Sequence, residues 1–438
     1  MKKFGTMRVN ELDHLEIGGC DTLELIREFG SPLYVVDEDL VRKNCRKFRE
    51  NFIDAIPGGE VAYASKAFTN LAMIRIIVQE GLGVDVVSAG ELYTALAAGA
   101  DPARIDFNGN NKTPEEIRYA LENKVGRIIV DNFTEIEMIE KIAGEMGAVP
   151  KVLLRTQPGI EAHTHEYIQT GKIDSKFGLS VTTGQAMEAL RLMSQSKNME
   201  LVGIHCHIGS QIFEVEPFVQ AAKIMVGFMA YVRDALGVTL KELNLGGGFG
   251  IYYNSIDTPT SFKSFSQAMY DALREEFQAL DFPHPSRISV EPGRSIIGNA
   301  GTTLYTVGTI KTIPRVRTYV AVDGGMTDNP RPALYQAKYE MALANKMSAT
   351  DQIVASIAGK CCESGDMLIW DTSMPWVETG DILAVASTGA YNYSMSSNYN
   401  RLPRPGVVLV REGKAQVIVE RETFADLIRN DRIPEHLK

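Results

Sequence analysis

The chain has 438 residues, of which 45% are apolar and 23% are charged, a composition typical of a globular enzyme rather than of a disordered protein. Because single hydrophobic cores stop growing near ~250–300 residues, this length predicts two domains. The net charge is −10 and the basic residues are scattered, so we expect no nucleic-acid partner. Residues 1–20 lack an apolar segment of signal-peptide type, and no run of ~18 uncharged apolar residues follows, so we expect neither a signal peptide nor a membrane span.

The cysteines also bear on the compartment. There are five of them, too few for a disulfide scaffold, and their odd number leaves at least one free thiol. This usage predicts a protein of the reducing cytoplasm. The five are Cys20, Cys45, Cys206, Cys361 and Cys362.

From residue 60 onward, short β-branched runs alternate with segments of helical period, some of which open with a capping signal such as Asn132 or Thr134, or Thr113-Pro114 followed by two glutamates. This alternation predicts parallel strands joined by crossover helices. Eight such units favour a closed (β/α)8 barrel, with a doubly wound open sheet as the alternative, and a barrel places its active site at the C-terminal ends of the strands. The predicted strands are 60–67, 83–88, 104–109, 126–131, 151–156, 200–208, 242–247 and 287–292.

After residue 296 the pattern changes to short β-rich runs broken by Gly, Pro or Asp, with Glu412-Gly413 as a hairpin turn. An isolated strand-like run at 32–37 could pair with these strands or cap the barrel. We therefore expect a barrel over residues 40–295 and a second, mostly β domain formed by residues 1–39 and 296–438.

Lys66 is predicted at the end of the first barrel strand. A lysine at a strand end is most often simply exposed, but partial desolvation would give the neutral amine that forms an imine with an aldehyde. The seventh strand runs into Leu245-Gly-Gly-Gly-Phe-Gly250, a loop whose amides can converge on a phosphate where barrels commonly hold one; the plain alternative is a flexible turn.

The eighth strand ends in Glu291-Pro-Gly-Arg294, which an exposed ion pair could also explain. Strand alternation predicts His205 and His207 on one face. With His163 and His165 they could form a zinc site, but no zinc motif accompanies them, so we expect no metal. A lysine, an imidazole, a phosphate loop and a carboxylate are together the parts that hold pyridoxal 5'-phosphate, with the acid keeping the pyridine nitrogen protonated. At 4 Å and an effective dielectric of ~20 that attraction is about 4 kcal/mol.

The whole pattern resembles the pyridoxal-phosphate-dependent basic amino-acid decarboxylases with an alanine-racemase-like barrel. Within this family it is most similar to the decarboxylases that convert meso-2,6-diaminopimelate into L-lysine and carbon dioxide, the last step of lysine biosynthesis. Seven motifs in order carry the resemblance over nearly the whole chain: YASKAF (63–68), HCHIGSQ (205–211), LGGGFG (245–250), EPGRS (291–295), RPALY (331–335), CESGD (362–366) and the tyrosine of GAYNYSMSSNYN.

The resemblance implies a role for each matching residue. Lys66 would be the Schiff-base lysine, His207 would stack on the pyridine ring, and Glu291 would bind the ring nitrogen. Cys362 would return a proton to the α-carbon. The remaining cofactor contacts implied are Ser210, Gly246, Gly247, Gly248, Gly293, Arg294 and Tyr391, and the substrate contacts implied are Arg294, Arg331, Tyr335, Glu363 and Tyr391.

The resemblance further implies a homodimer with shared active sites, because the family places the CESGD segment across a subunit interface. One departure is Phe68, since many relatives follow the lysine with Ala-Asn. Alternatives left open are another basic amino acid as substrate (ornithine, arginine or carboxynorspermidine), a racemase on the same fold, a non-catalytic cofactor-binding protein, a metal-dependent hydrolase, and a purely structural role for the two adjacent cysteines. Glu291 speaks against the racemase, in which an arginine would face the ring nitrogen.

Overall fold

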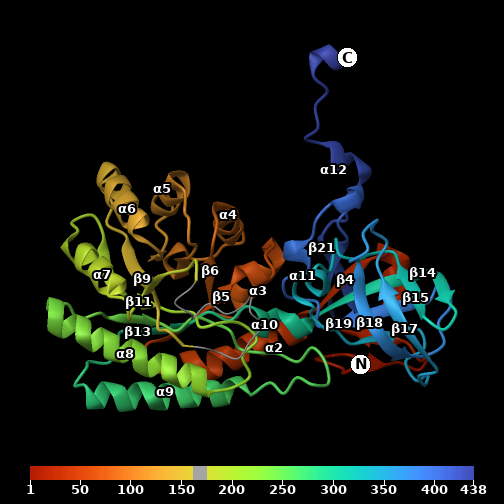
Figure 1. The fold of residues 1–438 in the computed structure, drawn as a ribbon, viewed down its shortest axis with the longest axis horizontal. Coiled ribbons are helices and arrows are strands. Elements are labelled where there is room, and N and C mark those ends of the chain that lie inside the picture. Colours follow the sequence, from red (N-terminus) through yellow and green to blue (C-terminus); the bar gives the residue numbers. More distant parts are fainter. Residues whose placement is uncertain (161–174) are drawn as a thin grey trace. The chain divides into compact units, whose positions relative to one another are not determined.

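The chain divides into two compact units in a computed structural model that describes residues 1–160 and 175–438 (Figure 1). One unit comprises residues 42–251 and 258–296, and the other comprises residues 1–41, 252–257 and 297–438. The sequence placed residues 252–257 inside the barrel domain, whereas the structure groups them with the β-rich unit. This short loop carries Tyr253, whose ring contacts Arg331 of the same unit.

A closed barrel forms the first unit. Within the described residues, eight parallel strands pair around a ring, which closes where β13 pairs with β5 and β8 with β9. The closed ring confirms the predicted (β/α)8 barrel over the doubly wound sheet. Its strands are β5 (Gly59–Ala64), β6 (Gly83–Val86), β7 (Ile105–Phe107), β8 (Arg127–Val130), β9 (Lys151–Gln157), β11 (Glu200–His205), β12 (Glu242–Asn244) and β13 (Arg287–Val290), with the short β10 (Leu179–Ser180) paired to β9.

Helices join these strands, and their starts follow from the sequence. Thr113 forms a capping box with Glu116, and the Asn132 side chain accepts from the Glu135 amide, so both predicted caps are present. The helices are α2 (Glu38–Phe48), α3 (Leu71–Gln79), α4 (Ala89–Ala97), α5 (Pro114–Glu122), α6 (Phe133–Met146), α7 (Gln185–Gln195), α8 (Glu216–Leu236), α9 (Phe262–Ala279) and α10 (Arg294–Ile297).

The barrel interior carries buried charges near the strand starts. Arg127 of β8 forms a bidentate pair with Glu242 of β12 at 2.6 and 3.0 Å, and Arg287 of β13 donates to Asp106 of β7 at 2.7 Å. Neither pair joins neighbouring strands, so both contacts cross the inside of the barrel. Arg287 also lies 3.7 Å from Glu242, which links the four side chains into one group, here called the lower network.

The β-rich unit is a second sheet system with its own apolar core. β4 (Leu33–Asp37) lies between β14 and β20, so the isolated run at 32–37 pairs with this unit rather than capping the barrel. Glu412 and Gly413, both at positive φ, form the predicted turn between β20 and β21. The other strands are β1 (Arg8–Val9), β2 (Leu15–Ile17), β3 (Cys20–Asp21), β14 (Gly301–Ile313), β15 (Arg317–Val322), β16 (Met341–Leu343), β17 (Ile353–Ala358), β18 (Met367–Met374), β19 (Ile382–Ala386), β20 (Gly406–Arg411) and β21 (Lys414–Val419).

Short helices complete the β-rich unit: α1 (Thr22–Phe29), α11 (Arg331–Tyr335) and α12 (Phe424–Ile428). Its core combines Leu15, Ile17 and Leu25 with side chains from β4, β14, β19 and β20. In the part of the chain that the structure describes, no helix combines the length and the apolar character needed to cross a bilayer.

We predict that Arg287→Met lowers the unfolding temperature of the barrel. The substitution leaves Asp106 and part of Glu242 buried without their cation, which costs roughly 3–5 kcal/mol when one partner of a buried pair is removed. Differential scanning calorimetry measures the shift. Arg191→Met is the control, because its pair with Glu188 is exposed and is worth under ~1 kcal/mol. Equal shifts in the two variants would contradict a stabilising lower network.

Candidate active site

A second group of polar side chains lies at the strand ends, centred on the buried carboxylate of Glu291. Its Oε1 accepts from the amides of Asn244 at 2.7 Å and Asn108 at 3.1 Å, and its Oε2 lies 3.0 Å from Nε2 of His205. The Asn108 amide also donates to Asp85 at 2.6 Å. We call these five residues the upper network. The upper network lies one layer nearer the C-terminal strand ends than the lower network. Asn108 comes two residues after Asp106 of β7, and Asn244 comes two residues after Glu242 of β12.

The upper network separates the charge states of its two acids. Burial acts to raise the pKa of Glu291, but attraction to His205 and the hydrogen bonds from His205 and Asn244 outweigh it and lower that pKa to about 2. Burial and the nearby Glu291 charge raise the pKa of Asp85 well above its usual value. At neutral pH Glu291 is therefore ionised, and Asp85 is the weaker acid of the two.

The glycine loop packs backbone to backbone against two neighbouring segments. A Cβ at Gly246, Gly247 or Gly248 would come within 2.1–2.4 Å of a carbonyl oxygen, those of Cys206, Glu291 and Gly209 respectively. Only glycine permits this approach, and Gly246 and Gly248 also have positive φ.

Two more predicted residues lie beside these segments. Arg294 donates to the Ser210 hydroxyl at 2.9 Å, and a Cβ at Gly293 would lie 3.0 Å from the Ala64 carbonyl oxygen. The structure thus brings the HCHIGS, LGGGFG and EPGR segments together with the end of β5.

Lys66 sits in a short 3-10 turn, Ser65–Ala67, directly after β5, and its side chain is exposed. Its charge is near enough to act on the pKa values of Asp85, Glu91 and His207. Two hydrogen bonds of 3.0 Å stabilise this turn. The Phe68 amide donates to the Ser65 carbonyl, and the Tyr63 hydroxyl donates to the Phe68 carbonyl. Phe68 is buried, so the departure from the Ala-Asn pattern fills the core beneath the lysine.

His207 requires a correction. The predicted strand 200–208 ends at His205, so His207 lies in the following loop and the two rings do not share a strand face. His205 binds Glu291, whereas Nδ1 of His207 accepts from the Gly247 amide at 3.2 Å. Burial and the charges of Lys66 and Arg155 lower the pKa of His207 well below its usual value, so this ring is neutral.

The zinc alternative involved four histidines, of which His205 and His207 are described. His163 and His165 lie outside the described residues. Among residues 1–160 and 175–438, no group of three or more His, Cys, Asp or Glu side chains is arranged to hold a metal ion.

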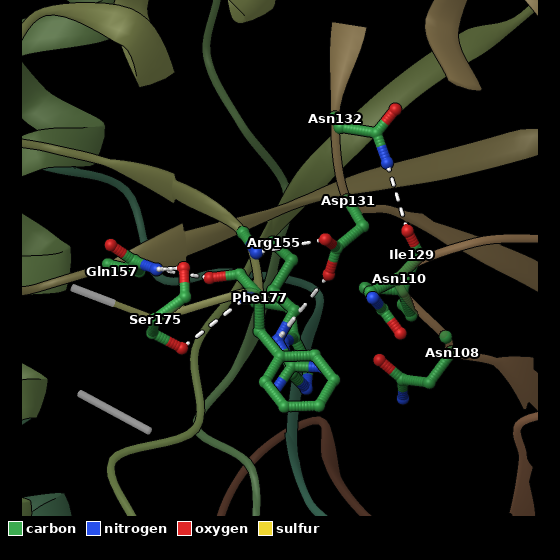
Figure 2. Close-up of polar contacts among 12 residues, drawn as sticks. Asn108, Asn110, Ile129, Asp131, Asn132, Arg155, Gln157, Ser175 and Phe177 are labelled. Carbon is green, nitrogen blue, oxygen red and sulfur yellow. Dashed lines mark hydrogen bonds and ion pairs between the residues drawn. The ribbon is translucent and has the colours of Figure 1, made fainter. Parts of the chain in front are cut away.

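A further cation borders the site at the ends of β8 and β9. Figure 2 shows Arg155 beside Asp131, with Nε and Oδ1 3.9 Å apart, and beside the Phe177 ring, whose centroid is 4.4 Å from the guanidinium carbon. The other Asp131 oxygen accepts from the Gly178 amide at 3.0 Å. Gln157 donates to the carbonyl of Phe177. These contacts fix residues 175–178 against the barrel strands.

In the β-rich unit, Arg331 begins α11 and is buried, with 8% of its surface exposed. Its Nη1 donates to the Tyr339 hydroxyl at 2.6 Å. Tyr391, held at a positive φ of 62°, is close enough for its phenol to act on the pKa of Arg331. Tyr335 ends the same short helix and is half-buried.

The two adjacent cysteines face different surroundings. Cys361 is buried, and burial and the Asp366 carboxylate raise the pKa of its thiol to about 11. Cys362 is exposed, and its amide donates to the Asn400 side chain at 2.7 Å. Glu363 is also exposed, and its carboxylate accepts from the Gly365 amide. Of the pair, Cys362 is the thiol that a solute can reach.

Sequence reasoning missed most partners of Glu291 and the Arg155 pair. A signal for them was present, because a polar residue stands at or just beyond the end of nearly every predicted barrel strand. These residues come from different strands, and they meet only in the closed barrel. Their pairing can therefore be recognised only when the fold is known. The missed residues are Asp85, Asn108, Asp131, Arg155, His205 as a Glu291 partner, and Asn244.

We predict that Glu291→Gln reduces the amount by which the free energy of unfolding falls when the pH is lowered from 7 to 3. The folded pKa of about 2 lies below the usual 4.5, so the ionised group stabilises the fold above pH 4.5, and this contribution is lost as the pH falls toward 2. The full difference corresponds to roughly 3 kcal/mol. Urea unfolding between pH 7 and pH 3 measures it. Ser289→Ala, a buried change two residues earlier in the chain that removes no charge, should keep the wild-type slope. An unchanged slope in Glu291→Gln would refute the assignment.

Comparisons with known proteins place these features in a family. A family model described as the pyridoxal-binding domain of pyridoxal-dependent decarboxylases matches residues 38–298. The chain is 53% identical over 427 residues to the diaminopimelate decarboxylase of Bacillus subtilis, covering 98% of this chain and 97% of that protein. The diaminopimelate decarboxylase of Staphylococcus aureus is 47% identical over 97% of this chain and 99% of its own.

Solved structures agree. The crystal structure of diaminopimelate decarboxylase from M. jannaschii in complex with L-lysine superposes with a TM-score of 0.92, at 37% identity over 99% of both chains. The Helicobacter pylori enzyme, also complexed with L-lysine, gives 0.85 at 33% identity over 93% of this chain and 98% of that one. The chain therefore belongs to the diaminopimelate decarboxylase family of pyridoxal-dependent decarboxylases.

Proposed function

We propose that the protein binds pyridoxal 5'-phosphate and decarboxylates meso-2,6-diaminopimelate to L-lysine and carbon dioxide. The observation that carries this proposal is the Glu291 carboxylate, buried at the strand ends and kept ionised by His205, Asn108 and Asn244. A fixed negative charge at this position suits the protonated nitrogen of a pyridine ring. The family membership and the lysine complexes of the relatives support the same substrate.

The residues present fit this cofactor. The close-packed glycine loop leaves no room for side chains, and loop amides together with Ser210 and Arg294 are suitable donors for a phosphate. The neutral His207 ring is suited to stack on a flat heterocycle without repelling a protonated one. Lys66 would hold the cofactor covalently through Nζ. When bound, pyridoxal 5'-phosphate supplies an aldehyde that links to amines and a ring that accepts the electron pair of the bond to be broken.

The chain's own groups would then control charge and protons. Glu291 would keep a proton on the ring nitrogen, and Lys66 would give up its place to the substrate amine. The Cys362 thiol would donate the proton that forms the new C–H bond where carbon dioxide has been lost. The exposure of Cys362, in contrast with buried Cys361, supports this assignment.

Residues of the β-rich unit would bind the far end of the substrate. Arg331 is a buried guanidinium suited to the carboxylate that the reaction leaves in place. Tyr335, Tyr391 and Glu363 would add contacts to the distal carboxylate and ammonium. We also propose a homodimer in the cytoplasm, with the segment 362–366 serving the partner subunit's site.

We predict that Lys66→Ala loses the visible absorbance of the cofactor-loaded protein, because the covalent link to Nζ cannot form. Absorbance spectra before and after borohydride reduction, together with the mass of the reduced protein, measure the link. Lys176→Met is the control, because it changes a lysine beside Phe177 and leaves Nζ of Lys66 in place. Lys112 is unsuitable for this purpose, because it forms a buried ion pair with Glu135. An unchanged spectrum in Lys66→Ala would place the link elsewhere.

We predict turnover of meso-2,6-diaminopimelate with release of one carbon dioxide and one L-lysine per substrate, and rates at least ~100-fold lower with ornithine, arginine or carboxynorspermidine. The reason is the buried Arg331, which ligands without a distal carboxylate leave uncompensated. Carbon dioxide release and chromatography of the amino-acid product measure the reaction. Equal or greater turnover of ornithine would overturn the substrate assignment, and racemised product without carbon dioxide would overturn the reaction.

A further inference from the structure

Arg331 is a buried cation that lacks an anionic partner in the described part of the chain. With 8% of its surface exposed, it makes one hydrogen bond there, to the neutral Tyr339 hydroxyl. A guanidinium has five N–H donors, and a buried charge is costly unless it is paired. The surroundings of Arg331 therefore suit an anion supplied by a ligand.

Two tyrosine rings enclose this guanidinium. Its carbon lies 4.9 Å from the ring centroid of Tyr253 and 5.8 Å from that of Tyr339. The two rings meet edge to face, with centroids 5.4 Å apart and planes at 90°. Each tyrosine is 5% exposed, so the rings also keep water from the guanidinium. Ring faces attract a cation without neutralising it, which leaves its charge available to a carboxylate.

The rings are themselves held in place. The Tyr253 amide donates to Asp257 at 2.8 Å, which closes the loop 252–257 on itself. The preceding carbonyl, that of Tyr252, accepts from Asn299 at 2.7 Å and from Ser387 at 3.2 Å.

The Tyr252 hydroxyl donates to Glu340 at 2.7 Å, and Glu340 directly follows Tyr339 in the chain. The residues next to the two enclosing tyrosines are thus hydrogen-bonded to each other, and this bond helps to hold both rings in position.

We propose that Tyr253 and Tyr339 are positioning residues that orient Arg331 toward the distal carboxylate of the substrate and thereby set the preference for ligands that carry this group. The inference rests on the proposed function, because it takes Arg331 to bind substrate. Tyr339 fixes one edge of the guanidinium by its hydrogen bond, and Tyr253 fixes the plane by ring contact. The remaining N–H groups stay directed at the ligand.

Binding of two related ligands to the cofactor-loaded enzyme tests the proposal by isothermal titration calorimetry. L-Lysine keeps the distal carboxylate, and cadaverine is the same diamine without it. Tyr253→Leu should weaken L-lysine about five- to thirtyfold and leave cadaverine within about twofold. Tyr339→Phe, which keeps the ring and loses the hydrogen bond, should weaken L-lysine about three- to tenfold. Tyr253→Phe should restore most of the affinity lost in Tyr253→Leu, since the ring face returns.

Tyr319→Leu is the matched control, because Tyr319 makes a similar ring contact with Arg317, at 5.9 Å, elsewhere in the same unit. This variant should bind both ligands like the wild type. Unchanged L-lysine affinity in Tyr253→Leu and Tyr339→Phe, or parallel losses for L-lysine and cadaverine, would overturn the positioning role while leaving the proposed function intact. A wild-type enzyme that neither binds L-lysine nor releases carbon dioxide from diaminopimelate would instead overturn the proposed function, and this inference with it.

Discussion

The barrel depends on one constraint, that a carboxylate buried in its interior must stay ionised. Burial alone would protonate Glu291, and the surrounding donors reverse this. Those donors come from different strands, His205 from β11, Asn244 from β12 and Asn108 from just beyond β7. They reach one point only because the sheet closes, so the charge state of this acid is a property of the ring as a whole.

Side chains two residues apart on a strand point to the same face, and this explains how the two networks form successive layers. Asp106 and Asn108, and likewise Glu242 and Asn244, stand two residues apart, so each pair projects into the interior at successive levels. The lower network holds its charges in ion pairs across the barrel, and the upper network holds the Glu291 carboxylate by hydrogen bonds from three strand ends. The interior of this barrel thus contains two layers of paired polar and charged side chains in addition to buried apolar residues.

Much of this fold could be predicted from local sequence signals. The eight strands, the Thr113 capping box and the Glu412-Gly413 turn each follow from residues within a few positions of one another. Several strand ends were placed up to three residues too late, as at Ile208 and Gly247, because residues compatible with a strand continue beyond the last paired position. The Glu291 partners and the Tyr253 contact with Arg331 join distant segments, and no local pattern specifies such pairing. The candidate roles of Lys66 and Glu291 followed from their places at the ends of predicted strands, and that of Cys362 came from motif resemblance.

The tight packing of Gly246, Gly247 and Gly248 constrains how this region could change over evolutionary time. Their alpha carbons pack against the chain segments that leave β11 and β13, so the same contacts that shape the glycine loop also hold three strand ends together. A mutation that enlarged the loop would at the same time push those strands apart. The shape of the loop and the integrity of the barrel are therefore coupled here, so a change at this end of the barrel would have to begin at residues outside the loop.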